Sequence, residues 1–270
     1  LETLHSAQDV SLVGGSSLTI GNATLAVGDT LLMAGSKLGP ALVTGNTVIL
    51  KPSEHASLST LKLNELIGEA GFPDGVVQVL TGDGSTGDLL VRHPGIDKIS
   101  FTGSTTTARQ VLAGAATNLT PVILELGGKS ANIVFADADI DTAVMTTVFT
   151  ALAGMSGQGC VLPTRLLVED SIYDQVEELT VAAAAALNVG RPFDPGVQAG
   201  PVISEVSLDR ILDLISSATQ RGDGTLLTGG HRLEGDLSSG FFVRPTVFGN
   251  VDNASPVARD EIFGPVISLI

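Results

Sequence analysis

The sequence predicts an α/β protein with a doubly wound parallel sheet, followed by a second α/β domain. Short apolar runs that end in glycine, proline or polar residues alternate with longer segments of helical periodicity. This alternation is typical of right-handed strand–helix–strand crossovers, which build parallel sheets with helices on their faces. Of the 270 residues, 43% are hydrophobic and only 4% aromatic, so the predicted core is mainly aliphatic.

The first half of the chain carries the clearest alternation. Gly45 and Gly71 close two helical segments, at the position favoured just after a helix C-terminus. The segment before residue 26 is richer in Ser, Gly and Thr and is expected to hold one short strand at 17–25. The pattern then predicts helices at 31–44, 57–70 and 105–118, and strands at 47–50, 76–80, 98–101 and 121–126.

The second half repeats the alternation after Gly127. Its first helix is expected to begin at Asp137 or Asp139, since aspartate favours the N-cap. The pattern predicts strands at 131–135, 165–168, 225–227 and 242–248, and helices at 139–152, 172–187 and 205–221. The predicted organisation is an atypical segment at 1–25, a Rossmann-like domain at 26–126 and an α/β domain at 127–270.

The composition excludes several classes of partner. The net charge of −15 argues against nucleic acid and anionic membranes, because no Lys/Arg cluster can neutralise phosphates. Residues 1–10 do not read as a signal peptide, and the longest apolar run, 181–187, is far short of the ~18 residues of a membrane span. A single cysteine fits a reducing, cytoplasmic location, and four scattered histidines predict no metal site.

Ligands of doubly wound sheets sit beyond the carboxyl ends of the strands. Gly103 and Ser104 lie between a strand and a helix, where a phosphate can approach backbone N–H groups, although such residues also begin ordinary helices. Lys51 and Glu54 can hydrogen-bond ribose hydroxyls or lie in a solvated loop. The predicted ligand edge carries Lys51, Gly82, Gly103, Ser104, Glu125, Leu126 and Gly127.

Cys160 and Glu125 are the candidate reactive pair. Cys160 is the only cysteine, and its neighbouring glycines indicate an exposed turn rather than the core, where cysteine is more often found. Glu125 interrupts an apolar strand, where a carboxylate is either paired structurally or available for acid–base chemistry. A thiol nucleophile and a carboxylate base are the minimal pair for forming and hydrolysing a thioester.

Six segments together resemble the NAD(P)-dependent aldehyde dehydrogenase superfamily. Three of them, Leu-Glu-Leu-Gly-Gly-Lys, Gly-Gln-x-Cys and Glu-Ile-Phe-Gly-Pro, are jointly very specific. The likeness runs almost continuously from residue 31 to residue 270, and it implies that 26–126 binds the cofactor and that 127–270 is the catalytic domain. The six segments are 45–54, 101–105, 124–130, 157–160, 200–204 and 261–265.

The resemblance implies oxidation of a small-molecule aldehyde to a carboxylic acid with NAD. NADP is less favoured, because Glu54 would repel a 2′-phosphate. Cys160 would attack the aldehyde, and Glu125 would activate the water that hydrolyses the thioester. Glu261 would hold the nicotinamide ribose, and Phe263 would pack against the nicotinamide. The implied cofactor-binding residues are Lys51, Ser53, Glu54, Gly82, Phe101, Gly103, Ser104, Leu126, Gly127, Glu261 and Phe263.

The sequence also departs from the family pattern. An ungapped register places Gly28 where the family carries an asparagine that donates to the oxyanion, and losing one such donor typically costs ~10²–10³ in turnover. Met155 replaces an asparagine before Ser-Gly-Gln, and Ala108 replaces the last glycine of the phosphate turn. The family is homo-oligomeric, but its pairing segments are not expected within these 270 residues.

Two alternatives to aldehyde oxidation therefore stand. The first is a cofactor-binding fragment or pseudoenzyme without turnover, which Gly28 favours. The second is a CoA-acylating relative, in which a thiol rather than water resolves the thioester. Glu125 argues against the second alternative, because hydrolysis is the reaction that needs this base.

Overall fold

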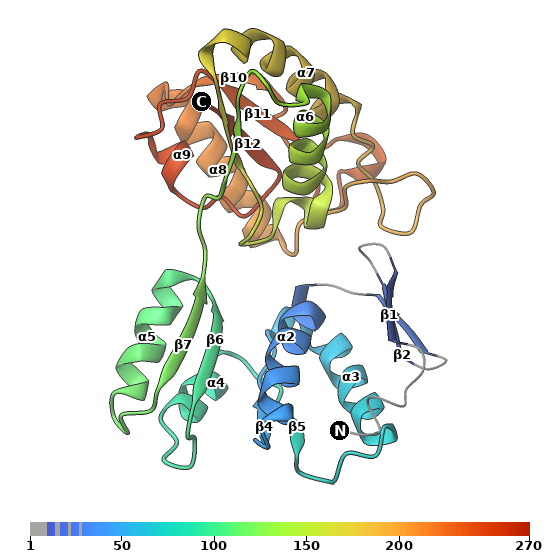
Figure 1. Ribbon diagram of the computed structural model, residues 1–270, viewed down its shortest axis with the longest axis vertical. Helices are drawn as coiled ribbons and strands as arrows, with labels where there is room; N and C mark the ends of the chain where they lie inside the picture. The colour runs from blue at the N-terminus through green and yellow to red at the C-terminus, as the bar shows by residue number, and fades with distance from the viewer. Residues whose placement is uncertain (1–9, 14–16, 21–22, 27–28) are drawn as a thin grey trace. The chain divides into compact units, whose positions relative to one another are not determined.

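The computed structural model describes residues 10–13, 17–20, 23–26 and 29–270. The chain divides into two compact units, Leu1–Leu126 and Gly127–Ile270 (Figure 1). Within the described ranges, no helix is both long and apolar enough to cross a membrane.

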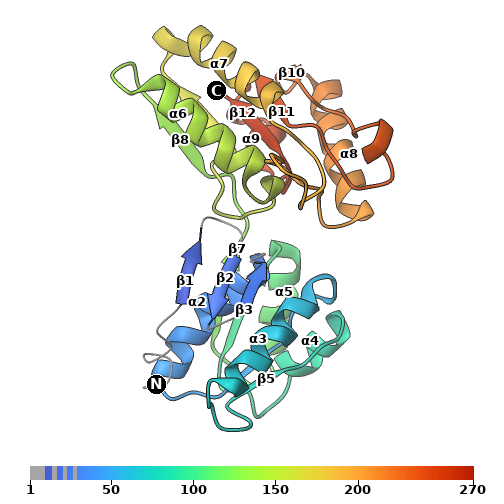
Figure 2. The ribbon, with the colours of Figure 1, turned by 90° about the vertical axis from the view of Figure 1, so that its right-hand side faces the viewer.

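The first described residues of this unit form three antiparallel strands, β1 (Val10–Val13), β2 (Ser17–Ile20) and β3 (Ala23–Ala26), in the order β1-β2-β3 (Figure 2). The prediction of one strand at 17–25 is wrong, because β2 and β3 are separate strands that pair with each other. The sequence between them is Gly-Asn, and both residue types have low strand propensity. Gly28 lies outside the described residues.

Two parallel strand pairs follow. β4 (Val48–Leu50) pairs with β5 (Val77–Val79), and β6 (Ile99–Gly103) pairs with β7 (Val122–Leu126). Among the described residues these pairs share no ladder, so the structure has two parallel ribbons where the sequence predicted one continuous sheet. Gly45 and Gly71 adopt φ of 81° and 88°, which confirms the predicted helix ends.

In the described part of this unit the α-helices are α2 (Asp29–Val43), α3 (Ser57–Glu69), α4 (Gly84–Val91) and α5 (Thr105–Ala115). The sequence pattern did not predict α4, which is eight residues long and contains two glycines. A small buried cluster from α2, α3 and β5 consists of Ala34, Leu38, Leu63 and Val77. Lys37 on α2 donates to the hydroxyl of Ser100 on β6 at 2.8 Å, which joins this helix to the second ribbon.

The second unit is built on one five-stranded sheet in the order β10-β11-β12-β9-β8. All neighbouring strands are parallel except β10 and β11. The predicted strand at 242–248 begins too early, because Pro245 cannot donate to a ladder and only Thr246–Gly249 joins the sheet. The strands are β8 (Ala131–Val134), β9 (Arg165–Val168), β10 (Thr225–Thr228), β11 (Thr246–Gly249) and β12 (Val266–Leu269).

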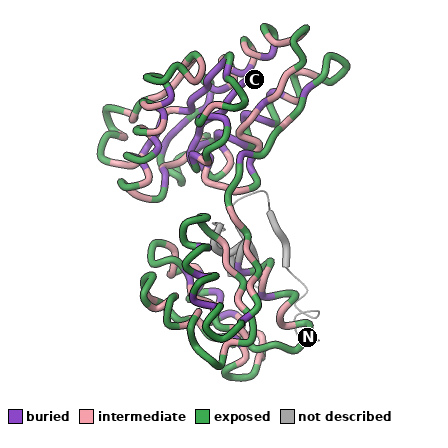
Figure 3. Tube along the Cα trace, turned by 90° about the vertical axis from the view of Figure 1, so that its left-hand side faces the viewer, coloured by how far each residue is buried: buried purple, intermediate pink, exposed green. Residues whose placement is uncertain are grey.

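Helices cover both faces of this sheet. α6 (Ile140–Val148) and α7 (Tyr173–Ala186) pack on one face, and α8 (Glu205–Arg221) and α9 (Pro256–Arg259) pack on the other (Figures 1 and 2). Among the described residues, most of the buried ones lie in this unit, where they are coloured purple in Figure 3. Asp139 caps α6 by accepting from the N–H of Thr142 at 3.2 Å, which confirms one of the two predicted N-caps.

Candidate active site

The loop that carries Cys160 starts where α6 changes its winding. After Val148 the backbone forms a π-helical turn, Phe149–Ala153, and then a tight turn with positive φ at three successive residues. These residues are Met155 (50°), Ser156 (54°) and Gly157 (74°). The predicted helix at 139–152 thus corresponds to α6 together with this π-helical turn. The half-buried Cys160, whose thiol is free, follows on an irregular loop.

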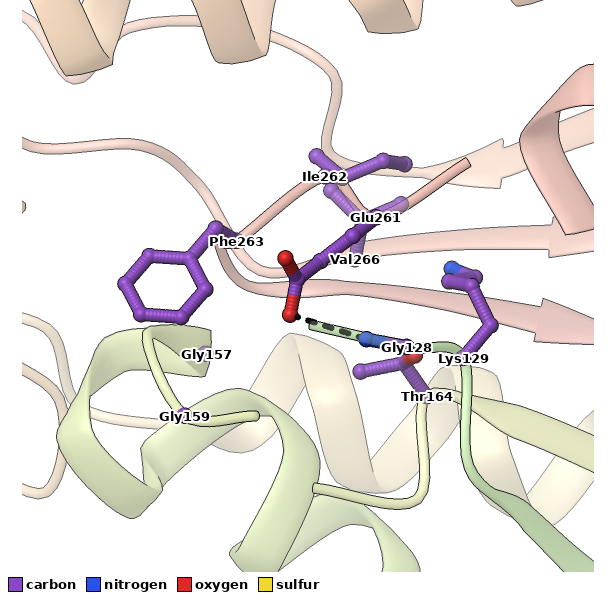
Figure 4. A pocket seen from close by; sticks show the side chains of 10 residues that line it. Gly128, Lys129, Gly157, Gly159, Thr164, Glu261, Ile262, Phe263 and Val266 are labelled. Atoms are coloured by element: carbon purple, nitrogen blue, oxygen red, sulfur yellow. Dashed lines mark hydrogen bonds between the residues drawn. The ribbon is translucent and has the colours of Figure 1, made fainter. Parts of the chain in front are cut away.

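Glu261 lies against the start of the second unit. Its Oε1 accepts a hydrogen bond from the backbone N–H of Gly128 at 3.3 Å (Figure 4). A Cβ added to Gly127 would overlap the same carboxylate, so this close approach requires glycine. The carboxylate therefore lies directly on the Gly-Gly backbone that follows β7.

Glu261 and Phe263 belong to one irregular segment before β12. Phe263 adopts φ of 52° and remains 38% exposed, so its ring is not a core side chain. In Figure 4 the ring lies on the side of Gly157, while the carboxylate of Glu261 points toward Gly128. The Arg210 guanidinium on α8 donates to the carbonyl of Ile262 at 2.6 Å and holds the segment in place.

These residues line a small cavity of about 10 Å³, roughly the space for one water molecule. Three segments contribute to the lining: the Cys160 loop through Gly157 and Gly159, the Glu261 segment, and the residues after β7. The lining residues are Gly128, Lys129, Gly157, Gly159, Thr164, Glu261, Ile262, Phe263, Gly264 and Val266.

Lys129 is the buried cation of this cavity. Its side chain is only 8% exposed, and within the described residues its Nζ has no hydrogen-bond partner. Burial lowers the pKa of Lys129 to about 8. The nearby Arg165 adds to this effect, and the carboxylates of Glu261 and Asp260 oppose it.

In the first unit, the second ribbon brings three predicted site residues together. Gly103 pairs with Leu126, and Thr102 pairs with Glu125, at the carboxyl ends of β6 and β7. Glu125 is exposed. Burial of Lys37 lowers the pKa of that lysine, and the negative charge of Glu125 partly opposes this effect.

The turn after β6 leads from Gly103, the last residue of the strand, to Ser104, the N-cap of α5. The ring of Phe101 lies where a Cβ on Gly103 would be, so a side chain at this position would have to displace the ring. Ser104 caps α5 by accepting from the N–H of Thr107 at 3.2 Å. The exposed first turn of α5 therefore leaves other backbone N–H groups facing outward.

The first ribbon carries the remaining predicted residues. The Lys51 side chain runs past Gly87 of α4, and its Nζ donates to the carbonyl of Pro52 at 2.9 Å. The Ser53 hydroxyl accepts from the N–H of His55, which starts a short 3₁₀ helix at Glu54. Both Ser53 and Glu54 are exposed.

Gly82 follows β5 with φ of 153°, and a Cβ there would overlap Thr86. The neighbouring Asp83 caps α4. Hydrogen bonds from Ser85 lower the pKa of Asp83, and the charge of Lys51 makes a smaller contribution in the same direction.

The structure thus brings the predicted residues together in three groups. Cys160, Gly127, Glu261 and Phe263 lie in the second unit; Gly103, Ser104, Glu125 and Leu126 lie at the end of the second ribbon; and Lys51, Ser53, Glu54 and Gly82 lie at the end of the first. Cys160 and Glu125 belong to different units. Within the part of the chain that is described, no three His, Cys, Asp or Glu side chains are grouped to hold a metal ion.

Sequence reasoning assigned no role to Lys129 or Arg210. Lys129 stands inside a recognised motif, and a lysine between two glycines and an apolar strand was an available signal. Arg210 gives no local signal, because its partner Ile262 is 52 residues away in sequence.

The Aldehyde dehydrogenase family model matches residues 29–270. The chain is 44% identical to human mitochondrial aldehyde dehydrogenase over 243 residues, which cover 89% of this chain and 46% of that protein. It therefore spans about half the length of the curated relatives it matches.

Solved structures give the same result. The betaine aldehyde dehydrogenase of Staphylococcus aureus in complex with NAD+ is similar with a TM-score of 0.85 at 37% identity, covering 89% of this chain and 48% of that one. Gamma-glutamyl-gamma-aminobutyraldehyde dehydrogenase of Burkholderia cenocepacia is similar with a TM-score of 0.84 at 44% identity and the same coverage. These matches confirm the predicted α/β fold, and the chain belongs to the aldehyde dehydrogenase family.

Proposed function

We propose that this chain supplies the cofactor-binding and nucleophile-bearing parts of an NAD-dependent aldehyde dehydrogenase, which oxidises an aldehyde to a carboxylic acid. The observation that carries the proposal is the second-unit site. There the loop of the only cysteine and the Glu261–Phe263 segment line one cavity beside Gly128. A nucleophile-bearing loop next to an exposed aromatic ring and a positioned carboxylate suits a redox reaction on a small carbonyl compound.

The described residues fit a dinucleotide. The exposed start of α5 at Gly103 and Ser104 offers backbone N–H groups to a pyrophosphate. The exposed Lys51–Glu54 turn offers an ammonium group and a carboxylate to ribose hydroxyls, and Phe263 offers an aromatic face. NAD+ supplies a hydride acceptor when bound, and similar solved structures carry NAD+.

In the proposed reaction the Cys160 thiolate attacks the aldehyde carbon, and the carbonyl oxygen becomes the oxyanion of a thiohemiacetal. Loss of hydride from that carbon leaves an acyl-cysteine thioester. Glu125 then takes a proton from water, whose oxygen attacks the thioester carbon. Collapse expels the Cys160 thiolate and releases the carboxylic acid. Glu125 then gives its proton to solvent, and the chain returns to its starting state.

The test is aldehyde-dependent NADH production by the 270-residue chain and by Cys160→Ser, which preserves size and removes the thiolate. We expect turnover by the wild type and a loss of at least ~10³-fold in the variant, since the nucleophile has no replacement. Equal rates in both proteins would reject a Cys160 mechanism. Ser268→Ala, which removes one buried hydroxyl that does not line this cavity, is the control and should retain turnover.

Product and intermediate analysis separates the alternatives. Carboxylic acid as product supports hydrolysis with Glu125 as base, and Glu125→Gln should then accumulate the thioester on Cys160. Formation of acyl-CoA, only when CoA is added, would instead support the acylating relative. NAD binding by calorimetry without any acyl-enzyme in the mass spectrum would identify a pseudoenzyme, in line with Gly28.

A further inference from the structure

The backbone before Cys160 is held in a conformation that it would not adopt unaided. Met155 and Ser156 have φ of 50° and 54°, in the left-handed region that side-chain-bearing residues rarely occupy. Two such residues in succession persist only where the surrounding structure holds them. The contacts that hold this turn therefore decide where the next residues, including Cys160, are placed.

Ser156 supplies the first of these contacts. Its side chain is only 5% exposed, and its hydroxyl makes two hydrogen bonds to one residue 44 positions away. The Oγ donates to the carbonyl of Gly200 at 3.0 Å and accepts from the N–H of Gly200 at 3.0 Å. A serine hydroxyl can do both at once, so neither backbone group of Gly200 is left unpaired here.

Gln158 supplies the second contact from the other end of the turn. Its Nε2 donates to the carbonyl of Met155 at 3.0 Å, and its Oε1 accepts from the N–H of Ile203 at 2.9 Å. One side-chain amide therefore closes the turn on itself and joins it to the same downstream segment that Ser156 holds.

The downstream segment is itself held from its other side. The carbonyl of Ala199 accepts from the N–H of Gly190 at 3.0 Å, and the N–H of Val202 donates to the carbonyl of Phe241 at 2.8 Å. The segment then runs into α8, which Ser204 caps. Residues 200–203 are therefore a fixed support rather than a free loop.

We propose that Ser156 and Gln158 are positioning residues that fasten the Cys160 loop to residues 200–203 and so set where the thiol lies. This inference rests on the proposed role of Cys160, because it assigns a purpose to the placement of that thiol. The hydrogen bonds of both side chains go to backbone groups of Met155, Gly200 and Ile203, so both residues act through the backbone.

The test uses the single thiol as its own probe. Because Cys160 is the only cysteine, iodoacetamide labelling of the intact chain reports on this loop alone. Ser156→Ala is compared with Ser268→Ala, which also removes one fully buried hydroxyl of the second unit, bonded to Val257 at 3.2 Å. Both variants lose the same group, but only Ser156 joins the Cys160 loop to Gly200.

We expect Ser156→Ala to be alkylated at least about fivefold faster than the wild type, since the loss of one net hydrogen bond alone shifts a population about fivefold and Ser156 makes two. The alkylation rate is measured from about pH 6 to pH 10. A change in exposure of the thiol alters the rate at every pH, whereas a change in its ionisation shifts the pH profile. Hydrogen exchange at the Gly200 amide should accelerate in the same variant. Ser268→Ala should match the wild type in both measurements.

Equal labelling and equal Gly200 exchange in Ser156→Ala and Ser268→Ala would overturn the proposal. If Ser156→Ala does not fold, Gln158→Ala removes two bonds from a half-buried side chain and is judged by the same labelling rate and by exchange at the Ile203 amide. Labelling does not depend on turnover. If alkylation of Cys160 changes as expected but the chain makes no NADH, the proposed function is refuted and the positioning role is retained.

Discussion

Replacing Lys129 with methionine is expected to stabilise the second unit near neutral pH. The lysine is 8% exposed, its Nζ has no hydrogen-bond partner within the described residues, and burial lowers its pKa to about 8. An unfolded chain gives the same group a pKa of about 10.4. Methionine keeps the apolar stem in place and removes the buried charge.

The magnitude follows from the two pKa values. A gap of roughly 2.4 units corresponds to about 3 kcal/mol, which is the penalty for folding with the lysine charged. Below about pH 8 both states bind the proton, and the wild type bears the whole penalty. Between about pH 8 and pH 10.4 only the unfolded chain binds it, so wild-type stability rises with pH through that window and then levels off.

Urea unfolding at a series of pH values tests this reasoning. The chain has one tyrosine and no tryptophan, so the emission of Tyr173 reports on the second unit. Lys129→Met should exceed the wild type by about 3 kcal/mol at pH 7, and the difference should shrink by about 2 kcal/mol by pH 9.5. Lys98→Met, at an exposed lysine, is the control and should show no such trend. A constant difference, or a less stable Lys129→Met at pH 7, would refute the argument.

Two further substitutions test local packing. Gly157→Ala should lower the urea midpoint far more than Gly222→Ala. The two glycines have similar φ values, 74° and 72°, but a Cβ on Gly157 would overlap the backbone of Gly264, whereas a Cβ on Gly222 would face open space. The Gly222 change should cost only the about 1–2 kcal/mol of a left-handed residue, and equal losses would contradict the packing argument. Tyr173→Phe should lower the free energy of unfolding by about 1–2 kcal/mol, because the N–H of Asn250 loses the hydroxyl to which it donates at 2.6 Å. Circular dichroism measures the change, and an unchanged free energy would show that this hydrogen bond does not contribute to stability.

The sequence predicts an element well where local signals mark both ends. The predicted helix at 205–221 matches α8 to the residue, because Ser204 supplies an N-cap and Gly222 a left-handed end. The strand at 165–168 matches β9 equally well. By contrast, β12 and α4 were not predicted. The four residues of β12 pair with β11 on one side and with β9 on the other, and these long-range neighbours cannot be read from the local sequence.

The same distinction applies to the site. The roles of Cys160 and Glu261 were proposed from short motifs, and the structure places both residues in the second unit. The motif around Lys129 was equally visible, but the burial of its side chain was not, because the cavity that it lines also includes residues of the segment 261–266, more than a hundred positions away. The joint action of Cys160 as nucleophile and Glu125 as base stays a prediction. Accumulation of the thioester on Cys160 in Glu125→Gln would test it.

The place of β12 has a consequence for the order in which the chain folds. This strand, residues 266–269, is the middle strand of the five, between β11 and β9. During synthesis β8 and β9 emerge about a hundred residues before the strand that joins them to β11 and β10. Until then the nascent chain holds two separate strand pairs, so the sheet closes late through long-range contacts that are slow to form. A ribosome-bound chain stalled before residue 266 should therefore expose the apolar surfaces of β9 and β11 to chaperones.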